Sequence, residues 1–489
     1  MLTIPPSLGP KGAPSYVADT LIIGAGPSGL AAACRLVEAG LRPVIVEKST
    51  NFGGLMRSIQ HGSFVVDLGR KELYSRIPEV DTLWNNLLGQ DYRPYPHRVG
   101  SLYGGRILEM SGAFRGLRRG MTHWSFLRGA IDLGQSWVVS GFRKPATYQD
   151  YWYQRAGEQF ARTLAQGYWE KFRGQRWVDM PAPDVLSDGR SAQSYSFGAI
   201  AHGVKLAVGG GPSSQRQWRH PARGTGQICS AQVNYLRNAG VEVKYETDII
   251  AMHPADHSIA CALGHGPSGQ IRFQAKSIIS SLQIEALIAL IDGRERHKTT
   301  EMRYRTVILV YLFLEEEPRF PHAWLEVNDM ALNCGRITNY AAFNGEMVPP
   351  GRTALCVEFF LDSEDQKIGK ADKEWVRLAI SECAFAALID PSKLSDSLVV
   401  RLARTNAAAS WREAQETSRL QLFGQIEAYR NLFHVYRPGT DWATYAGMMA
   451  AEAIISGERH NFDRRADPTR SYTASHSRPE TGEEIYRSP

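Results

Sequence analysis

The sequence predicts an α/β fold with one domain built on a parallel sheet and a second, mixed α+β domain. An apolar stretch at 20–23 runs into a glycine-rich turn and then into an Ala/Leu-rich segment, 29–39, that is typical of a helix. A second apolar stretch, 43–46, follows at once and ends in Glu47. At 489 residues the chain is too long for one hydrophobic core. We therefore expect a discontinuous Rossmann-like domain beside a second domain.

The turn between strand and helix has the spacing expected of a dinucleotide-binding motif. The first glycine permits the tight turn, the second lets main chain approach a pyrophosphate, and the third lets helix and strand pack closely. Glu47 stands where an acid hydrogen-bonds a ribose hydroxyl and repels a 2′-phosphate. A glycine-rich turn without a ligand is the plain alternative. The predicted cofactor-binding residues of the turn are Gly24, Gly26, Pro27, Ser28 and Gly29.

A second glycine pair, Gly53-Gly54, follows six positions after Glu47 and leads to Met56 and Arg57. The run from 18 to 57 resembles the FAD fingerprint of the flavin amine oxidase and protoporphyrinogen oxidase superfamily, which is related to UDP-galactopyranose mutase-like proteins. The resemblance implies that the paired glycines let the chain pass the diphosphate and that Arg57 lies near it. The FAD-binding residues expected here are Lys48, Gly53, Gly54, Met56 and Arg57.

Two later segments resemble the same superfamily. The first, 220–281, contains a glycine-rich turn, a helix and strands, and the resemblance implies that main chain around Ile249 runs along the adenine. The second, 435–457, implies a strand end that passes the flavin and a helix whose N-terminus points at the ring, with Arg437 and Thr444 as contacts. Tyr436 stands where the superfamily has the first glycine of its Gly-Arg-x-Gly pattern. A core helix that closes the domain is the alternative.

The resemblance covers about 18–457 and gives a domain plan. The expected FAD-binding domain comprises 17–84, 216–290 and 425–460. The expected substrate-binding domain comprises 85–215 and 291–424, and residues 168–174 match a Tyr-x-x-Lys-x-x-Gly element of protoporphyrinogen-oxidase-like and mutase-like proteins. Residues 1–16 are expected to form a flexible lead and 461–489 a disordered tail.

Two residues are predicted to be catalytic. Lys71 occupies the histidine position of an Asp-x-Gly-x-His pattern on the flavin side of the superfamily, where a lysine could stabilise reduced flavin, bind an anionic substrate or act as a base. An exposed loop lysine is the alternative. Arg336 matches an arginine-bearing strand and is expected to clamp a carboxylate or phosphate, the alternative being an exposed edge-strand arginine. Glu358 is expected to pair with an arginine rather than abstract a proton.

The segment 112–144 interleaves basic and apolar residues. Such a pattern suits peripheral attachment to an anionic bilayer, a lid over an anionic substrate, or a solvated basic edge. Its five glycines are expected to weaken a continuous membrane helix. The basic and glycine positions are Arg115, Arg118, Arg119, Arg128, Arg143 and Lys144, and Gly112, Gly116, Gly120, Gly129 and Gly134.

The composition excludes several classes. Charged residues at 22% and hydrophobic residues at 43% are typical of a globular protein, and the apolar run 307–314 is long enough for a buried strand but not for a bilayer span. The net charge of +6 and the motifs do not favour nucleic acid. The six cysteines are scattered and predict core positions rather than a metal site. With no secretory pattern at the N-terminus, we expect a cytoplasmic protein, with peripheral membrane contact as an option.

The function expected from these features is that of an FAD-dependent oxidoreductase acting on a small or glycosylated biosynthetic substrate. Hydride would pass to the flavin, and oxygen or another acceptor would reoxidise it. One alternative is a redox-neutral sugar mutase resembling UDP-galactopyranose mutase, which needs paired arginines on a nucleotide diphosphate. A second is a non-catalytic protein resembling the Rab escort and dissociation-inhibitor group. The intact glycines and Glu47 favour an enzyme.

Overall fold

The computed structural model describes residues 14–71, 73, 75, 77–96, 98–110, 120–140, 145–182, 217–293, 304–407 and 421–466. The chain forms two compact units. Unit 1 comprises 1–94, 218–302 and 413–469, and unit 2 comprises 95–217, 303–412 and 470–489. The sequence predicted domain boundaries after 84, 215, 290 and 424. In the structure the boundaries fall after 94, 217, 302 and 412, so each differs from the expected one by twelve residues or fewer.

Unit 1 is built on a seven-stranded sheet whose parallel part carries the glycine-rich turn. The order along the sheet is β10-β11-β12-β1-β2-β9, and β18 also pairs with β12. β1 pairs in parallel with β12 and β2, whereas β10, β11 and β12 form an antiparallel meander. The strands are β1 (Ser15–Ile23), β2 (Pro43–Val46), β9 (Val243–Lys244), β10 (Asp248–Ala255), β11 (Ser258–Gly266), β12 (Gly269–Ser280) and β18 (Leu432–His434).

The helices of unit 1 place their apolar residues in the core. Eleven residues of α14 are buried, and α1 buries eight, as expected for helices rich in alanine and other small residues. The helices are α1 (Pro27–Glu38), α2 (Pro78–Leu88), α9 (Gly226–Asn238), α10 (Ile284–Asp292), α14 (Thr440–Ser456) and α15 (Arg459–Arg465). Shorter elements are the hairpin β3 (Ser58–His61) and β4 (Phe64–Asp67), and the 3-10 turns η1 (Gly54–Met56) and η2 (Gly89–Asp91).

Unit 2 contains a second seven-stranded sheet, ordered β17-β13-β16-β15-β14-β6-β7. Neighbouring strands of this sheet run antiparallel, except for β14 and β6, which are parallel. All eleven residues of β13 are buried, which confirms the predicted buried strand. The strands are β6 (Val99–Tyr103), β7 (Arg106–Glu109), β13 (Tyr304–Leu314), β14 (Trp324–Val327), β15 (Arg336–Asn339), β16 (Thr353–Asp362) and β17 (Leu394–Ala407).

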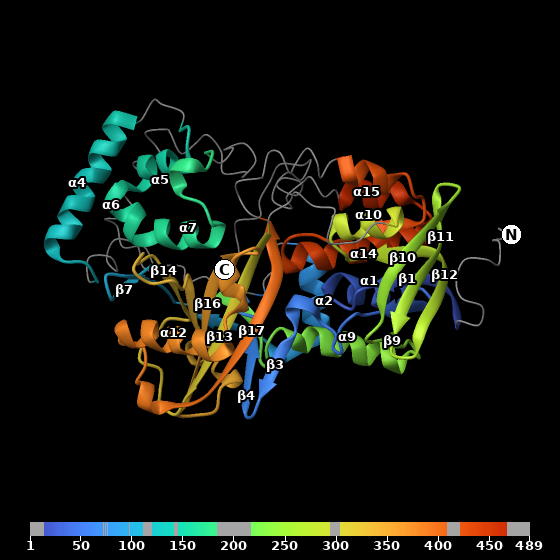
Figure 1. Cartoon of the computed structure of the whole chain (residues 1–489), viewed down its shortest axis with the longest axis horizontal. Helices are drawn as coiled ribbons and strands as arrows, with labels where there is room; N and C mark the ends of the chain where they lie inside the picture. The colour runs from blue at the N-terminus through green and yellow to red at the C-terminus, as the bar shows by residue number, and fades with distance from the viewer. Residues whose placement is uncertain are drawn as a thin grey trace. The chain divides into compact units, whose positions relative to one another are not determined.

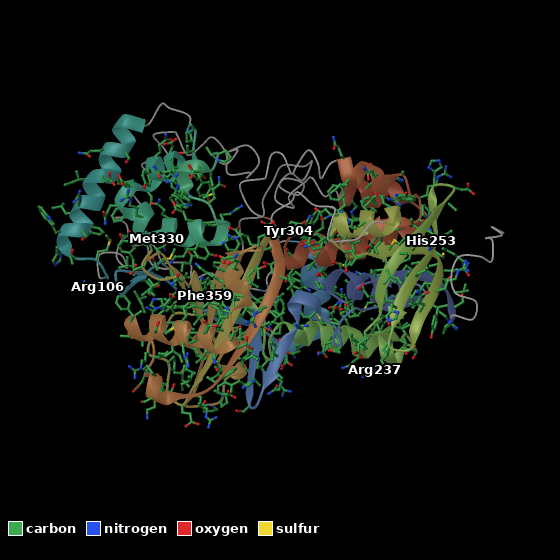
Figure 2. All side chains as sticks on the ribbon, in the orientation of Figure 1. Arg106, Arg237, His253, Tyr304, Met330 and Phe359 are labelled. Atoms are coloured by element: carbon green, nitrogen blue, oxygen red, sulfur yellow. The ribbon has the colours of Figure 1, made fainter. Side chains whose placement is uncertain are left out.

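Helix α12 (Asp372–Phe385) packs against this sheet. Phe359, labelled in Figure 2, contacts Trp375 of α12 with ring centroids 5.1 Å apart. The short elements of this part are α11 (Tyr340–Phe343), η6 (Gly345–Met347), η7 (Gln366–Gly369) and η8 (Pro391–Lys393). Two further strands, β5 (Tyr92–Pro96) and β8 (Gln217–Pro221), pair where the chain passes from one unit to the other.

Unit 2 also contains a group of helices, drawn in teal and green in Figure 1. The glycines of 112–144 were expected to weaken a continuous membrane helix. Within the described part of this segment, α4 runs through Gly129 and Gly134, and none of the described helices has the length and the apolar character to cross a membrane. Gly129 lies against the ring of Phe160. The helices are α4 (His123–Ser140), α5 (Tyr148–Ala156), α6 (Glu158–Ala161), the π-helical η3 (Arg162–Gln166), α7 (Gly167–Arg173) and η4 (Trp177–Asp179).

The predicted tail needs a correction at its start. Residues 461–465 belong to α15, where Phe462 is buried and packs its ring on Phe433 with centroids 5.4 Å apart. An apolar anchor, Phe462, and hydrogen bonds from Arg437 to the Ala466 carbonyl oxygen hold this polar segment. The predicted lead also needs a correction at its end, because residues 15 and 16 belong to β1. The rest of the predicted tail, 467–489, and residues 1–13 of the predicted lead lie outside the described residues.

We predict that Gly447→Ala lowers the free energy of unfolding by about 1–3 kcal/mol, because α14 crosses α1 at main-chain distance. A Cβ at Gly447 would lie 2.0 Å from the carbonyl oxygen of Ser28. The control is Gly134→Ala in α4, where a Cβ meets nothing within 4 Å. That variant is expected to keep or raise stability. Equal urea midpoints for the two variants would contradict the close crossing.

Candidate cofactor site

The glycine-rich turn follows β1 and contains two positions without room for a side chain. Gly24 has a φ of +102°, in the region that favours glycine, and a Cβ there would lie 2.1 Å from the hydroxyl oxygen of Ser281. A Cβ on Gly29 would lie 2.0 Å from the carbonyl oxygen of Gly24. These contacts agree with the roles predicted for both glycines, a tight turn and close helix–strand packing.

The second glycine of the turn faces open space at the N-terminus of α1. A Cβ on Gly26 would meet nothing within 4 Å, so packing against the described chain does not require a glycine here. No side chain caps this helix end, Pro27 occupies its first turn, and no acid lies in that turn. Uncapped amides and the positive end of the helix dipole suit an anion. The residues present therefore fit a cofactor diphosphate.

Glu47 is held in place at the end of β2. One carboxylate oxygen accepts a hydrogen bond from the Ala25 amide at 2.8 Å, and the other accepts from the amide and hydroxyl of Ser49 at 2.8 and 2.7 Å. A carboxylate offers about four acceptor sites, so one remains after these three bonds. That is the capacity needed for a ribose hydroxyl. The neighbouring Lys48 instead forms an exposed ion pair with Asp248 at 3.1 Å.

The second glycine pair lies against the first turn. The amide of Gly53 donates to the carbonyl oxygen of Ala25 at 2.7 Å, and a Cβ on Gly54 would lie 3.4 Å from the Cα of Gly26. Both glycines have positive φ angles, +97° and +52°. The structure therefore brings Gly53 and Gly54 to the predicted diphosphate site. Met56 is buried, and Arg57, which ends the turn, is half-buried.

Ile249 is placed beside the end of β2 by main-chain hydrogen bonds. The amide of Thr247 donates to the Glu47 carbonyl oxygen at 2.9 Å, and that of Glu246 donates to Ser49 at 3.1 Å. The Ile249 side chain is 2% exposed and belongs to the core of unit 1. Only its main chain is therefore available to a ligand, and the contact with adenine that the resemblance implies stays a prediction.

A buried network that the sequence analysis missed supports the glycine loop. Asp67 and His220 are both fully buried, and their side chains lie 3.0 Å apart. Asp67 also accepts from Ser58 and from the amide and hydroxyl of Thr225, and the Thr225 hydroxyl is 2.9 Å from the Met56 carbonyl oxygen. The network thus fixes the segment that directly follows Gly53-Gly54. The sequence signals were Asp67-Leu-Gly and the glycine-rich segment that begins at His220, but neither indicated that the two meet.

Arg437, just before α14, and Thr444, in its second turn, were both predicted to contact the flavin. The Arg437 guanidinium donates to the main-chain oxygens of His434, Tyr436 and Ala466, so it anchors the end of α15. Its contact with a flavin stays a prediction. Thr444 is 2% exposed and donates to the carbonyl oxygen of Thr440 at 2.8 Å. These bonds show structural roles for both side chains.

A half-buried acid stands at the start of α14. Asp441 accepts from its neighbour's amide, Trp442, at 2.8 Å and from the Ser75 hydroxyl at 3.3 Å. Burial raises the pKa of the Asp441 carboxyl above its usual 3.8, although these hydrogen bonds oppose the shift.

Lys71, the first residue predicted to be catalytic, lies on the segment after β4 and is half-buried. Its catalytic role stays a prediction.

The second predicted catalytic residue, Arg336, is used differently from what the sequence suggested. Its guanidinium forms two hydrogen bonds with Glu358, at 2.8 and 2.6 Å, and donates to the Tyr168 hydroxyl at 3.2 Å. Burial acts to lower the pKa of Arg336, but the Glu358 carboxylate raises it. The pairing predicted for Glu358 is confirmed. The clamp on an anionic substrate is corrected, because Glu358 already neutralises this charge inside unit 2.

The Tyr-x-x-Lys-x-x-Gly element joins α7 to the sheet of unit 2. The Lys171 ammonium donates to the carbonyl oxygens of Val327, Asp329 and Cys334 at 2.7–3.1 Å. Burial lowers the pKa of Lys171. Gly174 has a φ of +72° and packs on the buried guanidinium of Arg305. Lys171 and Gly174 of this element therefore both have structural roles within unit 2.

Residues 22–85 match the family described as an NAD(P)-binding Rossmann-like domain. Two curated relatives match short stretches. One is a 4,4′-diapophytoene desaturase of Staphylococcus aureus, 36% identical over 74 residues, which are 15% of this chain and 14% of the relative. The other is protoporphyrinogen oxidase 2 of Arabidopsis thaliana, 33% identical over 75 residues, 15% of each chain. The matches thus span about one seventh of the relatives' length.

Solved structures match over nearly the whole chain. Reduced UDP-galactopyranose mutase superimposes with a TM-score of 0.67 at 18% identity, covering 91% of this chain and 99% of the other. A protein assigned as a protoporphyrinogen oxidase in Exiguobacterium superimposes with a TM-score of 0.69 at 15% identity, covering 91% and 100%. The predicted resemblance is confirmed in the fold. At these identities the likeness establishes architecture, and chemistry must be argued from residues.

The described residues contain no cluster of three or more His, Cys, Asp or Glu side chains that could hold a metal ion. All six cysteines are free and buried, as predicted. Burial raises the pKa of Cys34 and Cys229 to about 12, so these thiols stay protonated at neutral pH.

We expect Arg336→Ala to lower the free energy of unfolding by about 3–5 kcal/mol, because Glu358 would keep a buried charge without its partner. The double variant Arg336→Met/Glu358→Leu is expected to recover most of this loss. The matched control is Arg352→Ala, which removes an exposed pair with Glu315 and should cost at most about 1 kcal/mol. A single variant as stable as this control, measured by urea unfolding, would refute the buried-pair interpretation.

Asp441→Asn should raise the urea midpoint at pH 7. Burial raises the folded-state pKa of Asp441 above its unfolded value of 3.8. Protonated Asp441 therefore contributes its full stability below pH 3.8, and this contribution is lost as the pH rises through the folded-state pKa. The gain of the Asn variant should therefore disappear toward pH 4. Asp390→Asn is a control with the opposite sign. Hydrogen bonds from Ser392 lower the pKa of the Asp390 carboxyl, so replacing this carboxylate should reduce the stability at pH 7. Parallel pH profiles for wild type and Asp441→Asn would contradict the assignment.

Proposed function

We propose that the protein is an FAD-dependent oxidoreductase that removes a hydride from a small or glycosylated substrate. The observation that carries the proposal is the uncapped N-terminus of α1, which faces open space at Gly26 with Gly53-Gly54 against it. FAD, when bound, supplies a ring that accepts two electrons and a proton from the substrate and passes the electrons to an acceptor.

The residues of unit 1 have distinct parts in holding FAD. The α1 N-terminus and the amides of the glycine turn bind the diphosphate. Glu47 accepts from a hydroxyl of the adenosine ribose through its remaining acceptor site, and its charge disfavours a 2′-phosphate. The half-buried Arg57 stands next to the paired glycines and neutralises phosphate charge. The main chain near Ile249 lies beside Glu47 and receives the adenine.

The residues proposed for the reacting end are fewer. Lys71 follows β4 and provides a cation that stabilises negative charge on the reduced ring or orients an anionic group of the substrate. The N-terminus of α14 contributes a positive dipole end to the same purpose, but Asp441 lies in that first turn. A neutral Asp441 leaves this dipole uncompensated, and an ionised one opposes it. The protonation state of Asp441 therefore tunes how well α14 stabilises reduced flavin.

A redox-neutral sugar mutase is the less supported alternative. It needs arginines that are available to a nucleotide diphosphate, and Arg336, the candidate in the sequence, is neutralised by Glu358. The two functions can be separated by kinetics. An oxidoreductase consumes one equivalent of acceptor per turnover, whereas a mutase needs only a catalytic pool of reduced flavin. A non-catalytic escort protein would purify without colour and could not be reconstituted with FAD.

Gly26→Glu is expected to abolish FAD binding, because it places a carboxylate where the diphosphate lies. Wild-type protein reconstituted with FAD should show the flavin band at about 450 nm, and this variant should not. Gly134→Glu, a glutamate introduced in unit 2, is the control and should retain the band. Circular dichroism and urea midpoints report whether both variants fold. A folded Gly26→Glu protein with full FAD occupancy would overturn the proposed site.

A further inference from the structure

Helix α4 of unit 2 exposes an apolar face. The exposed fractions are 77% for Trp124, 49% for Leu127 and 54% for Ile131. The three residues follow one another at intervals of three and four, so they lie on one side of the helix. Arg128 is exposed beside them. Large apolar side chains grouped in this way mark a surface that binds another apolar phase.

The opposite side of α4 is packed, which fixes the direction of the exposed face. The rings of Phe126 and Phe160 lie with centroids 6.0 Å apart, and Leu133 belongs to the same apolar cluster. The Asp132 carboxylate accepts from the amide of Gln159 at 2.8 Å. Figure 1 shows α4 in teal alongside α5 and α6. Trp124, Leu127 and Ile131 are therefore exposed on a helix whose other side is packed against unit 2.

The charge of this part of the chain indicates what the face binds. The sequence 111–144 contains six basic residues and one acid. The acid, Asp132, is used in the packing just described, whereas Arg128 is on the exposed side. A surface that combines an exposed tryptophan, aliphatic side chains and an arginine fits the boundary between acyl chains and anionic headgroups. A polar protein surface would leave the apolar side chains unmatched.

Crossing the bilayer is not the mode of attachment that fits this helix. Within the described ranges, no helix combines the length and the apolar character needed for a span. Helix α4 has 18 residues, but its packed side is occupied by α5 and α6. A helix with one apolar face and one protein-bound face can lie only along the membrane plane.

We propose that α4 docks the protein on an anionic lipid surface. The side chains of Trp124, Leu127 and Ile131 enter the boundary of the acyl chains, and Arg128 pairs with headgroup phosphates. The attachment is reversible and peripheral, because the inserted side chains come from one face of one helix. It depends on unit 2 alone and does not require that the proposed flavin chemistry be correct.

Sedimentation with lipid vesicles tests the proposal on the full chain. The vesicles contain phosphatidylcholine with about one third phosphatidylglycerol, or phosphatidylcholine alone. Trp124→Ser/Leu127→Ser/Ile131→Ser should lower the partition coefficient on anionic vesicles by about tenfold or more, since three apolar insertions are lost. The matched control is Phe385→Ser on α12, which removes an apolar side chain that is 66% exposed elsewhere on unit 2. This control should bind as wild type does.

The charge component is tested with Arg128→Glu. This variant should bind anionic vesicles several-fold more weakly and lose part of the salt dependence seen with wild type. Wild-type protein that does not sediment with anionic vesicles, or a triple variant that binds as well as Phe385→Ser, would overturn the proposal. A wild-type dimer in analytical ultracentrifugation that the triple variant loses, without vesicle binding, would assign the face to a second copy of the chain instead.

Discussion

The structure of unit 1 depends on how closely main chain packs around α1. Gly29 and Gly447 each leave no room for a Cβ, since a carbonyl oxygen would lie 2.0 Å away in both cases. Because these contacts are made by main chain, they need no side chain at the helix N-terminus. That end of α1 therefore stays uncapped while β1 and α14 hold the helix in place. An anion that binds there meets amides that are already oriented, which reduces the entropy lost on binding.

Two acids of unit 1, Asp67 and Asp441, are shielded from solvent to different degrees. A buried carboxylate is costly unless hydrogen bonds satisfy it. Asp67 meets this condition with His220, Ser58 and Thr225, so it can hold the segment after Gly53-Gly54 rigidly. Asp441 has two hydrogen bonds, and burial raises its pKa. Asp67 therefore serves as a fixed support, whereas Asp441 is an acid whose pKa is shifted by its surroundings.

The parts of the site that could be predicted from sequence are those set by local chemistry. Gly24 and Gly29 follow from the strand–turn–helix pattern, and Glu47 from its position after β2. Side chains whose partners lie far along the chain could not be predicted in this way. Arg336 was expected to bind an anionic substrate, but its partner Glu358 is 22 residues away on the adjacent strand. Arg437 depends on Ala466, and Asp67 on His220, contacts that no local pattern contains.

The same reasoning bears on the substrate. Three basic side chains inside unit 2 could have recognised a negative charge, but each has an internal partner. Arg336 is paired with Glu358, Arg305 with Asp362, and Lys171 with three carbonyl oxygens. Substrate charge therefore cannot be transferred from proteins that share the fold at 14–18% identity. An anionic group on the substrate would have to compete with these internal partners for the three side chains.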